Sequence, residues 1–229
     1  MITSNMSLCK VAAAARKDVG QVHRHVAEKH GDLWSLTSGK DREPIVRGGK
    51  FTSSKHLEWV YAVVAYRGHV RLYPLVWYAT TDGVNAMQID AEGPAAYFQP
   101  HVMHQFIKRF LKNGDLFDAM CRFIKWEHER VHFPHEYKGD RDNFVCLVED
   151  GYIAGEYLKE DAIIHFRTFY DKGAGHRKFG HLRKSLAWRN REKLPTFERT
   201  SRRETPHLAW CKGYELKPLL KQADRKSVV

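Results

Sequence analysis

Apolar residues recur at helical spacing near the start of the chain. Between Leu8 and about Lys29 they fall every three or four positions within an alanine-rich run, so the pattern predicts one amphipathic helix. Residues 35–54 contain several glycines and Pro44 among mixed charges, which is typical of a loop or linker. The apolar positions of the predicted helix are Val11, Ala15, Val19, Val22 and Val26.

A block of three strands is predicted after this loop. The runs Leu57–Arg67 and Val70–Thr80 are rich in Val, Tyr and Trp, and the break at Gly68 between them indicates a hairpin. Pro74 cannot donate a backbone hydrogen bond, so we expect its strand at a sheet edge or at a bulge. An Asp-Gly dipeptide then predicts a second tight turn, after which Val84–Ile89 alternates as a third strand.

Two helices and a second block of strands follow. Stripes of apolar residues predict one helix from about His101 to Lys112 and another from Asp115 to Pro134. Three runs then have the composition of strands, and an Asp-Gly turn joins the first two of them. The runs are Phe144–Glu149, Tyr152–Leu158 and Ala162–Tyr170.

This order of elements predicts an α+β fold. Strands joined by short turns pair antiparallel, so we expect an antiparallel sheet of about six strands in two three-stranded blocks, with the helices packed on one face. The pattern divides the chain into an N-terminal helix and linker (1–54), an α+β core domain (55–170) and a basic C-terminal extension (171–229) that packs partly on the core.

Composition narrows the class of protein. Hydrophobic residues make up 43% of the 229 residues and aromatic residues 12%, which is too many for a disordered chain. No uncharged stretch is long enough to span a membrane, so we expect no membrane contact. The four cysteines are widely spaced and form no CxxC pair, which favours a reducing, cytoplasmic location over a disulfide scaffold. No motif calls for a cofactor.

The net charge of +11 is concentrated near the C-terminus. Residues 171–203 contain eleven Lys and Arg against three acidic residues, an excess of +8, together with three aromatic residues. Basic side chains neutralise phosphates and aromatic rings stack on bases, so this segment predicts contact with nucleic acid, RNA favoured over DNA. A solvated surface segment is the alternative. The candidate contact residues are Arg177, Lys178, Arg183, Lys184, Trp188, Arg189 and Arg191.

Two groups of polar residues are candidates for catalysis. One lies on the polar side of the helix predicted from His101, and consists of His101, His104, Lys108 and Arg109. In the last predicted strand, His165 and Arg167 share a face, with Thr168 on the opposite face. Histidine can transfer protons near neutral pH, and Lys and Arg can hold a phosphate, which are the requirements of metal-independent RNA cleavage. An ordinary polar surface is the alternative for both groups.

A third motif suggests a metal site. Residues 128–132 read His-Glu-Arg-Val-His, which matches the H-E-x-x-H pattern. On one helix, His128 and His132 would face the same way and hold zinc, while Glu129 would activate a water molecule. The charge of Arg130 and the helix-ending Pro134 argue against this interpretation. A zinc-dependent hydrolase therefore remains an alternative, and our main interpretation assigns no metal.

The sequence has no phosphate-binding loop, dinucleotide fingerprint or nucleophile elbow. Its order of helix and strands, with His and Arg on a helix and Arg-Thr near the last strand, loosely resembles small bacterial ribonuclease toxins, a likeness of order and residue type without a continuous motif. We therefore expect a cytoplasmic nucleic-acid-binding protein that is a metal-independent ribonuclease or toxin-like effector, or a binding module without catalysis. A non-catalytic phage or mobile-element accessory protein is a further alternative.

Overall fold

The computed structural model describes residues 2, 6–36, 45–66, 69–89, 93–108, 120, 131–134, 143–148, 151–175, 177 and 214–215. The helices α1 (Leu8–Lys29), α2 (Leu33–Leu36) and α3 (Pro100–Phe106) lie in these ranges, and residues 172–175 are also helical. The strands before α3 are β1 (Ile45–Thr52), β2 (Glu58–Tyr66), β3 (His69–Thr80), β4 (Gly83–Gln88) and β5 (Ala95–Phe98). The strands after α3 are β6 (Val131–Pro134), β7 (Asn143–Val148), β8 (Gly151–Leu158), β9 (Ile163–Asp171) and β10 (Tyr214–Glu215).

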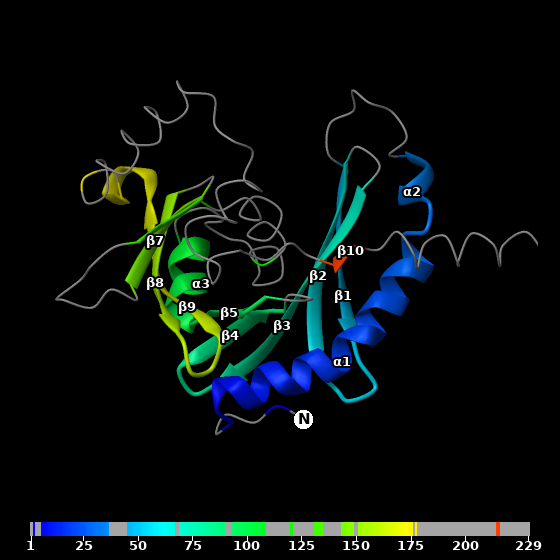
Figure 1. Ribbon diagram of the computed structural model, residues 1–229, viewed down its shortest axis with the longest axis horizontal. Coiled ribbons are helices and arrows are strands. Elements are labelled where there is room, and N and C mark those ends of the chain that lie inside the picture. Colours follow the sequence, from blue (N-terminus) through cyan, green and yellow to red (C-terminus); the bar gives the residue numbers. More distant parts are fainter. Residues whose placement is uncertain are drawn as a thin grey trace, which may run out of the picture.

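The described strands form one sheet in the order β1-β2-β3-β4-β5-β9-β8-β7-β6, with β10 paired to β3 (Figure 1). The α+β class and the mostly antiparallel pairing are confirmed, but the sheet has ten strands rather than about six. The two predicted blocks join through β5, which pairs parallel to β9 from Ala95 opposite Ile163 to Phe98 opposite Phe166. We missed β5 because four residues between two prolines are too short to show an alternating pattern.

Part of the expected linker is a strand. Residues 45–52 form β1, which pairs with β2 at the edge of the sheet, whereas residues 37–44 lie outside the described residues. Glycine is depleted in strands, so Gly48 and Gly49 made this segment look like a loop in the sequence. Gly49 is needed for packing, because a Cβ atom there would lie 2.3 Å from the hydroxyl oxygen of Tyr61.

The strand that contains Pro74 is not at an edge. β3 lies between β2 and β4, and the prediction of an edge or bulge is wrong. The carbonyl oxygen of Pro74 accepts a hydrogen bond from the amide of Ile89, just past the end of β4, so the backbone of Pro74 faces that side. β10 pairs with β3 at Arg71 and Leu72, before Pro74, on the side of β3 away from β2. Pro74 therefore lies between the residues of β3 that pair with β10 and those that pair with β4, where no strand requires its missing N–H.

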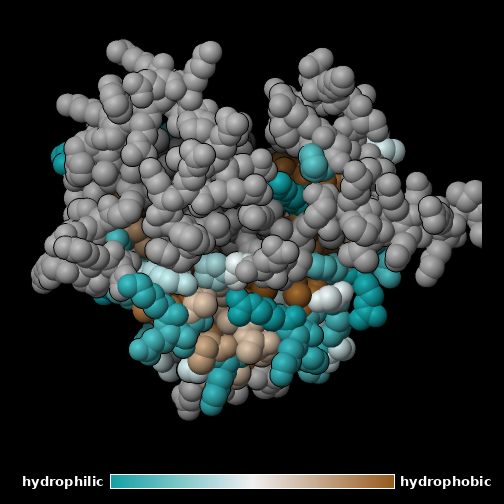
Figure 2. Space-filling view, in the orientation of Figure 1, coloured by the Kyte–Doolittle hydropathy of each residue, from teal (hydrophilic) through white to brown (hydrophobic). Residues whose placement is uncertain are grey.

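Helices cover both faces of the sheet, which corrects the expectation of one covered face. Along β2, residues Trp59, Tyr61 and Val63 pack in the same apolar cluster as α1, while Val60 and Ala62 pack in the cluster of α3. A strand that is apolar at nearly every position must be covered on both sides. In Figure 2, hydrophilic and apolar side chains mix along the part of the surface where α1 lies in Figure 1.

A buried carboxylate anchors α1 to the sheet. Asp18 is 1% exposed, and its two oxygens accept hydrogen bonds from the indole nitrogen of Trp59 (3.1 Å) and the amide of Gln21 (2.8 Å). Gln21 in turn accepts from the backbone amide of Ser54. Within the described ranges, no helix is long and apolar enough to cross a membrane.

Stability should fall in acid because α1 carries two partly buried histidines and is followed by the buried His30. Burial lowers the pKa of His23 from 6.5 to about 4, and burial also lowers the pKa values of His25 and His30. Between pH 6.5 and about 4 the unfolded chain binds a proton at His23 that the folded chain does not, so lowering the pH favours unfolding. Urea midpoints measured across this window should decline less steeply for His23→Gln. The exposed His104→Gln is the control, and parallel curves for His23→Gln and wild type would contradict the assignment.

Candidate functional site

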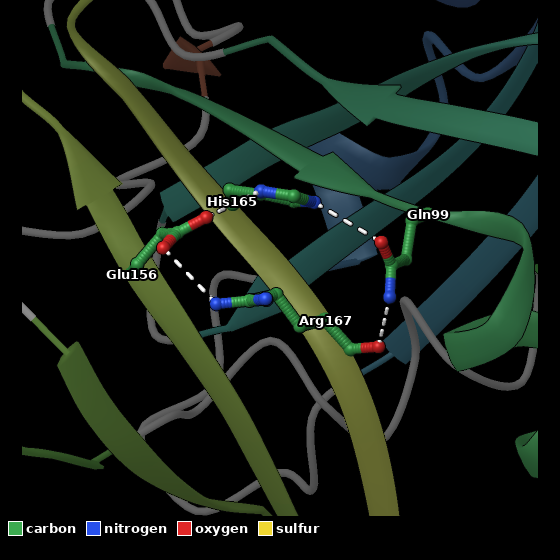
Figure 3. Close-up of polar contacts among 4 residues, drawn as sticks. All are labelled: Gln99, Glu156, His165 and Arg167. Atoms are coloured by element: carbon green, nitrogen blue, oxygen red, sulfur yellow. Dashed lines mark hydrogen bonds and ion pairs between the residues drawn. The ribbon is translucent and has the colours of Figure 1, made fainter. Parts of the chain in front are cut away.

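Four polar side chains meet on the sheet beside α3 (Figure 3). The two nitrogens of the His165 ring face Glu156 Oε1 (Nδ1, 3.1 Å) and Gln99 Oε1 (Nε2, 3.3 Å). Arg167 Nη1 donates to the second oxygen of Glu156 at 3.2 Å. The amide nitrogen of Gln99 donates to the main-chain carbonyl of Arg167, which closes the ring of contacts. We call these residues, Gln99, Glu156, His165 and Arg167, the His165 cluster.

Strand register places the members of the cluster. The β8–β9 hairpin sets Glu156 directly opposite His165. Next to them the register shifts, because Gly155 pairs with Phe166 and Ala154 pairs with Thr168, so Arg167 is an extra residue at a β-bulge. His165 and Arg167 share a face, since both contact Glu156. Thr168 lies on the same face as well, which corrects our expectation, because the bulge interrupts the alternation.

The cluster lies at the border of the part of the sheet that packs against α1. On this face of β9, Ile163 is fully buried in the cluster of α1, the side chain of His165 is 17% exposed and that of Arg167 is 54% exposed. Burial lowers the pKa of His165 from its ordinary 6.5, although the hydrogen bond to Glu156 acts in the opposite direction. His165 is therefore mainly neutral at pH 7 and can accept a proton.

A row of polar groups continues from the cluster across the sheet. The ring of Tyr97 lies against that of His165, with 5.0 Å between the centroids. Its hydroxyl donates to the side-chain oxygen of Asn85, which is 4% exposed, and the amide of Asn85 donates to Thr80 Oγ1 at 2.8 Å. This chain of hydrogen bonds fixes the Tyr97 ring and limits the movement of His165 beside it.

The structure does not bring the predicted helix residues to His165. Val102 and Met103 pack α3 in the apolar cluster that contains Phe166, on the face of β9 opposite His165. His101, His104 and Lys108 are exposed, so they point away from the sheet. Arg109 lies outside the described residues, as does the end of this predicted helix at 109–112. Among the described residues, the helix group and the strand group therefore lie on opposite faces of β9.

The H-E-x-x-H motif does not lie on one helix. Val131–Pro134 form β6, which pairs with β7 so that His132 is opposite Cys146. The prediction of a helix up to Pro134 is wrong at this end, because Val131 and Phe133 favour an extended chain and proline is tolerated at a sheet edge. His128 and Glu129 lie outside the described residues. Among the residues that are placed, no group of three His, Cys, Asp or Glu is arranged to hold a metal ion.

The start of the basic extension lies on the same face as the cluster. Gly175 is buried against the ring of Tyr152, where a Cβ atom would lie 2.1 Å from the ring. Tyr152 and Glu156 are separated by an even number of positions on β8, so they share a face. Arg177 is exposed. The remaining predicted contact residues lie outside the described residues: Lys178, Arg183, Lys184, Trp188, Arg189 and Arg191.

Sequence reasoning missed two members of the cluster. The position of Glu156 could have been predicted, because a four-residue turn between Leu158 and Ile163 places Glu156 opposite His165 in the hairpin. Gln99 had no signal, since it reaches the cluster only through the parallel pairing of β5 with β9. Comparisons with protein-family models, with curated proteins and with solved structures found no match to this chain. The chemistry of the cluster is therefore the basis for an assignment.

Proposed function

We propose that this protein binds RNA and cleaves it without a metal ion, at the His165 cluster. The observation that carries the proposal is the contact of a partly buried histidine, a carboxylate and an arginine at the border of the part of the sheet that packs against α1. These are the groups that phosphodiester transfer uses: a proton acceptor, a group that stabilises its charged form, and a cation for the phosphate. The basic extension supplies charge to hold the RNA backbone.

The roles follow from exposure and contacts. His165 takes the proton of the ribose 2′-hydroxyl at Nε2, because Nδ1 is held by the charged Glu156, whereas Nε2 faces the neutral amide oxygen of Gln99, which the hydroxyl displaces. The carboxylate of Glu156 stabilises the imidazolium that forms. Arg167 is half exposed and presents its remaining N–H groups to the phosphate. The 2′-oxygen bonds to phosphorus, the bond to the 5′-oxygen breaks, and that oxygen takes a proton from solvent.

Removing the charge of Glu156 tests this assignment. In buffer with EDTA, Glu156→Gln should cleave RNA about 10²-fold more slowly than wild type, because an amide does not stabilise the imidazolium. Glu160→Gln is the matched control, since Glu160 is exposed in the turn that follows β8. Equal rates for Glu156→Gln and wild type would remove the cluster from the reaction.

The basic extension should dominate RNA affinity. Each phosphate contact contributes about −0.7 to the slope of log affinity against log salt on a single strand, so a variant without four contacts should have a slope flatter by about 3. The variant replaces Arg183, Lys184, Arg189 and Arg191 with Gln. Fluorescence anisotropy at several salt concentrations measures the slope. An unchanged slope and affinity would place the RNA elsewhere on the protein.

A further inference from the structure

The side-chain amide of Gln99 has one orientation that satisfies its neighbours. Its nitrogen donates to the main-chain carbonyl oxygen of Arg167, an atom that can only accept. The amide oxygen is therefore the atom that faces Nε2 of His165, at 3.3 Å (Figure 3). Hydrogen-bonding partners thus fix which end of the amide meets the ring.

Both ring nitrogens of His165 consequently face acceptors. Glu156 Oε1 lies 3.1 Å from Nδ1, and Gln99 Oε1 lies near Nε2. A neutral imidazole has one N–H, so it donates to one of these oxygens and turns a lone pair toward the other. An imidazolium has two N–H groups and donates to both. The cluster is therefore complementary to the protonated ring.

We propose that Gln99 is a positioning residue that accepts the N–H formed at Nε2 when His165 takes up a proton, and so holds the imidazolium in place. Its role in cleavage rests on the proposed function, in which His165 takes the proton of the 2′-hydroxyl. During proton transfer the 2′-oxygen occupies the in-plane direction of Nε2, and Gln99 accepts the N–H once that oxygen has bonded to phosphorus. Glu156 and Gln99 then hold the two ring nitrogens from opposite sides.

The other groups that face His165 also influence the pKa of its ring. Burial and the charge of Arg167 lower the pKa of His165, whereas the carboxylate of Glu156 raises it. Tyr97 contributes ring contact. Gln99 is the neutral member of the set, so replacing it removes one acceptor and leaves these charges in place.

An NMR titration of the His165 ring in the full chain tests the proposal without substrate. Relative to wild type, Gln99→Leu should lower the pKa of His165 by about one unit, because the imidazolium loses an acceptor. Gln99→Glu places a charged acceptor at the same position and should raise the pKa. The matched control is Gln105→Ala, which removes an amide from α3 and should leave the titration unchanged.

The inference is overturned if neither Gln99→Leu nor Gln99→Glu moves the titration of His165, whether or not the protein cleaves RNA. If the titration shifts as expected but the wild type leaves RNA intact, the proposed function fails and the positioning role stands.

Discussion

Replacing His165 with alanine should reduce RNA cleavage by about 10²- to 10⁴-fold while RNA affinity changes little. The variant removes the proton acceptor but leaves Arg167 paired with Glu156 at 3.2 Å, so no partly buried charge loses its partner. RNA binding depends on the basic extension and is retained. Initial rates in EDTA give the effect on cleavage, and anisotropy gives the affinity. Circular dichroism of the same preparation controls for folding.

The double variant His101→Ala, His104→Ala separates the two predicted catalytic groups. Both residues are exposed on α3, which packs on the face of β9 opposite His165. We expect this variant to keep its cleavage rate and its stability. Loss of cleavage in the double variant, together with full activity of His165→Ala, would assign the chemistry to α3 instead.

Truncation of Phe166 should cost about 3–5 kcal/mol of the free energy of unfolding. Phe166 is fully buried, stacks on Phe98 with 4.7 Å between the ring centroids, and meets Phe144 edge-on at 5.5 Å. It thereby ties β9 to β5 and β7 at the point where the two blocks of strands become one sheet. A domain is stable by only about 5–15 kcal/mol, so Phe166→Ala removes a large share.

Urea unfolding measures this loss, and Phe166→Leu is the milder comparison because it keeps part of the buried volume. Cleavage should also fall in Phe166→Ala, since Phe166 stands between His165 and Arg167 on β9 and fixes the strand beneath them. A loss below about 1 kcal/mol would show that the site collapses around the cavity and that the junction does not depend on this ring.

The parts of the fold that were predicted correctly are those that depend on residues close together in the sequence. The spacing of apolar residues gave α1, and turn dipeptides gave the hairpins β3–β4 and β7–β8. The parallel join of β5 to β9 was not predictable in this way, because Ala95 and Ile163 are distant in the chain and neither flanking segment signals the other. The unbroken apolar run of β2 is the sequence signal for helices on both faces of the sheet.

The candidate site was predicted in part for the same reason. His165 and Arg167 were recognised from their shared strand, and Glu156 follows from hairpin register. Gln99 depends on the long-range pairing of β5. The bulge that brings Thr168 to the face of Arg167 has no marker in the sequence, since its residues are ordinary strand formers.

The chemistry of the RNA ends tests the central claim most directly. A defined RNA is incubated with the full chain in EDTA, and the products are examined by mass spectrometry, alongside a substrate with a single 2′-deoxy position at the cleavage site. Attack by the 2′-oxygen predicts a 2′,3′-cyclic phosphate and a 5′-hydroxyl, no cleavage at the deoxy position, and loss of these products with His165→Ala. Products that end in a 3′-hydroxyl and a 5′-phosphate, or intact RNA with the wild-type protein, would contradict the account.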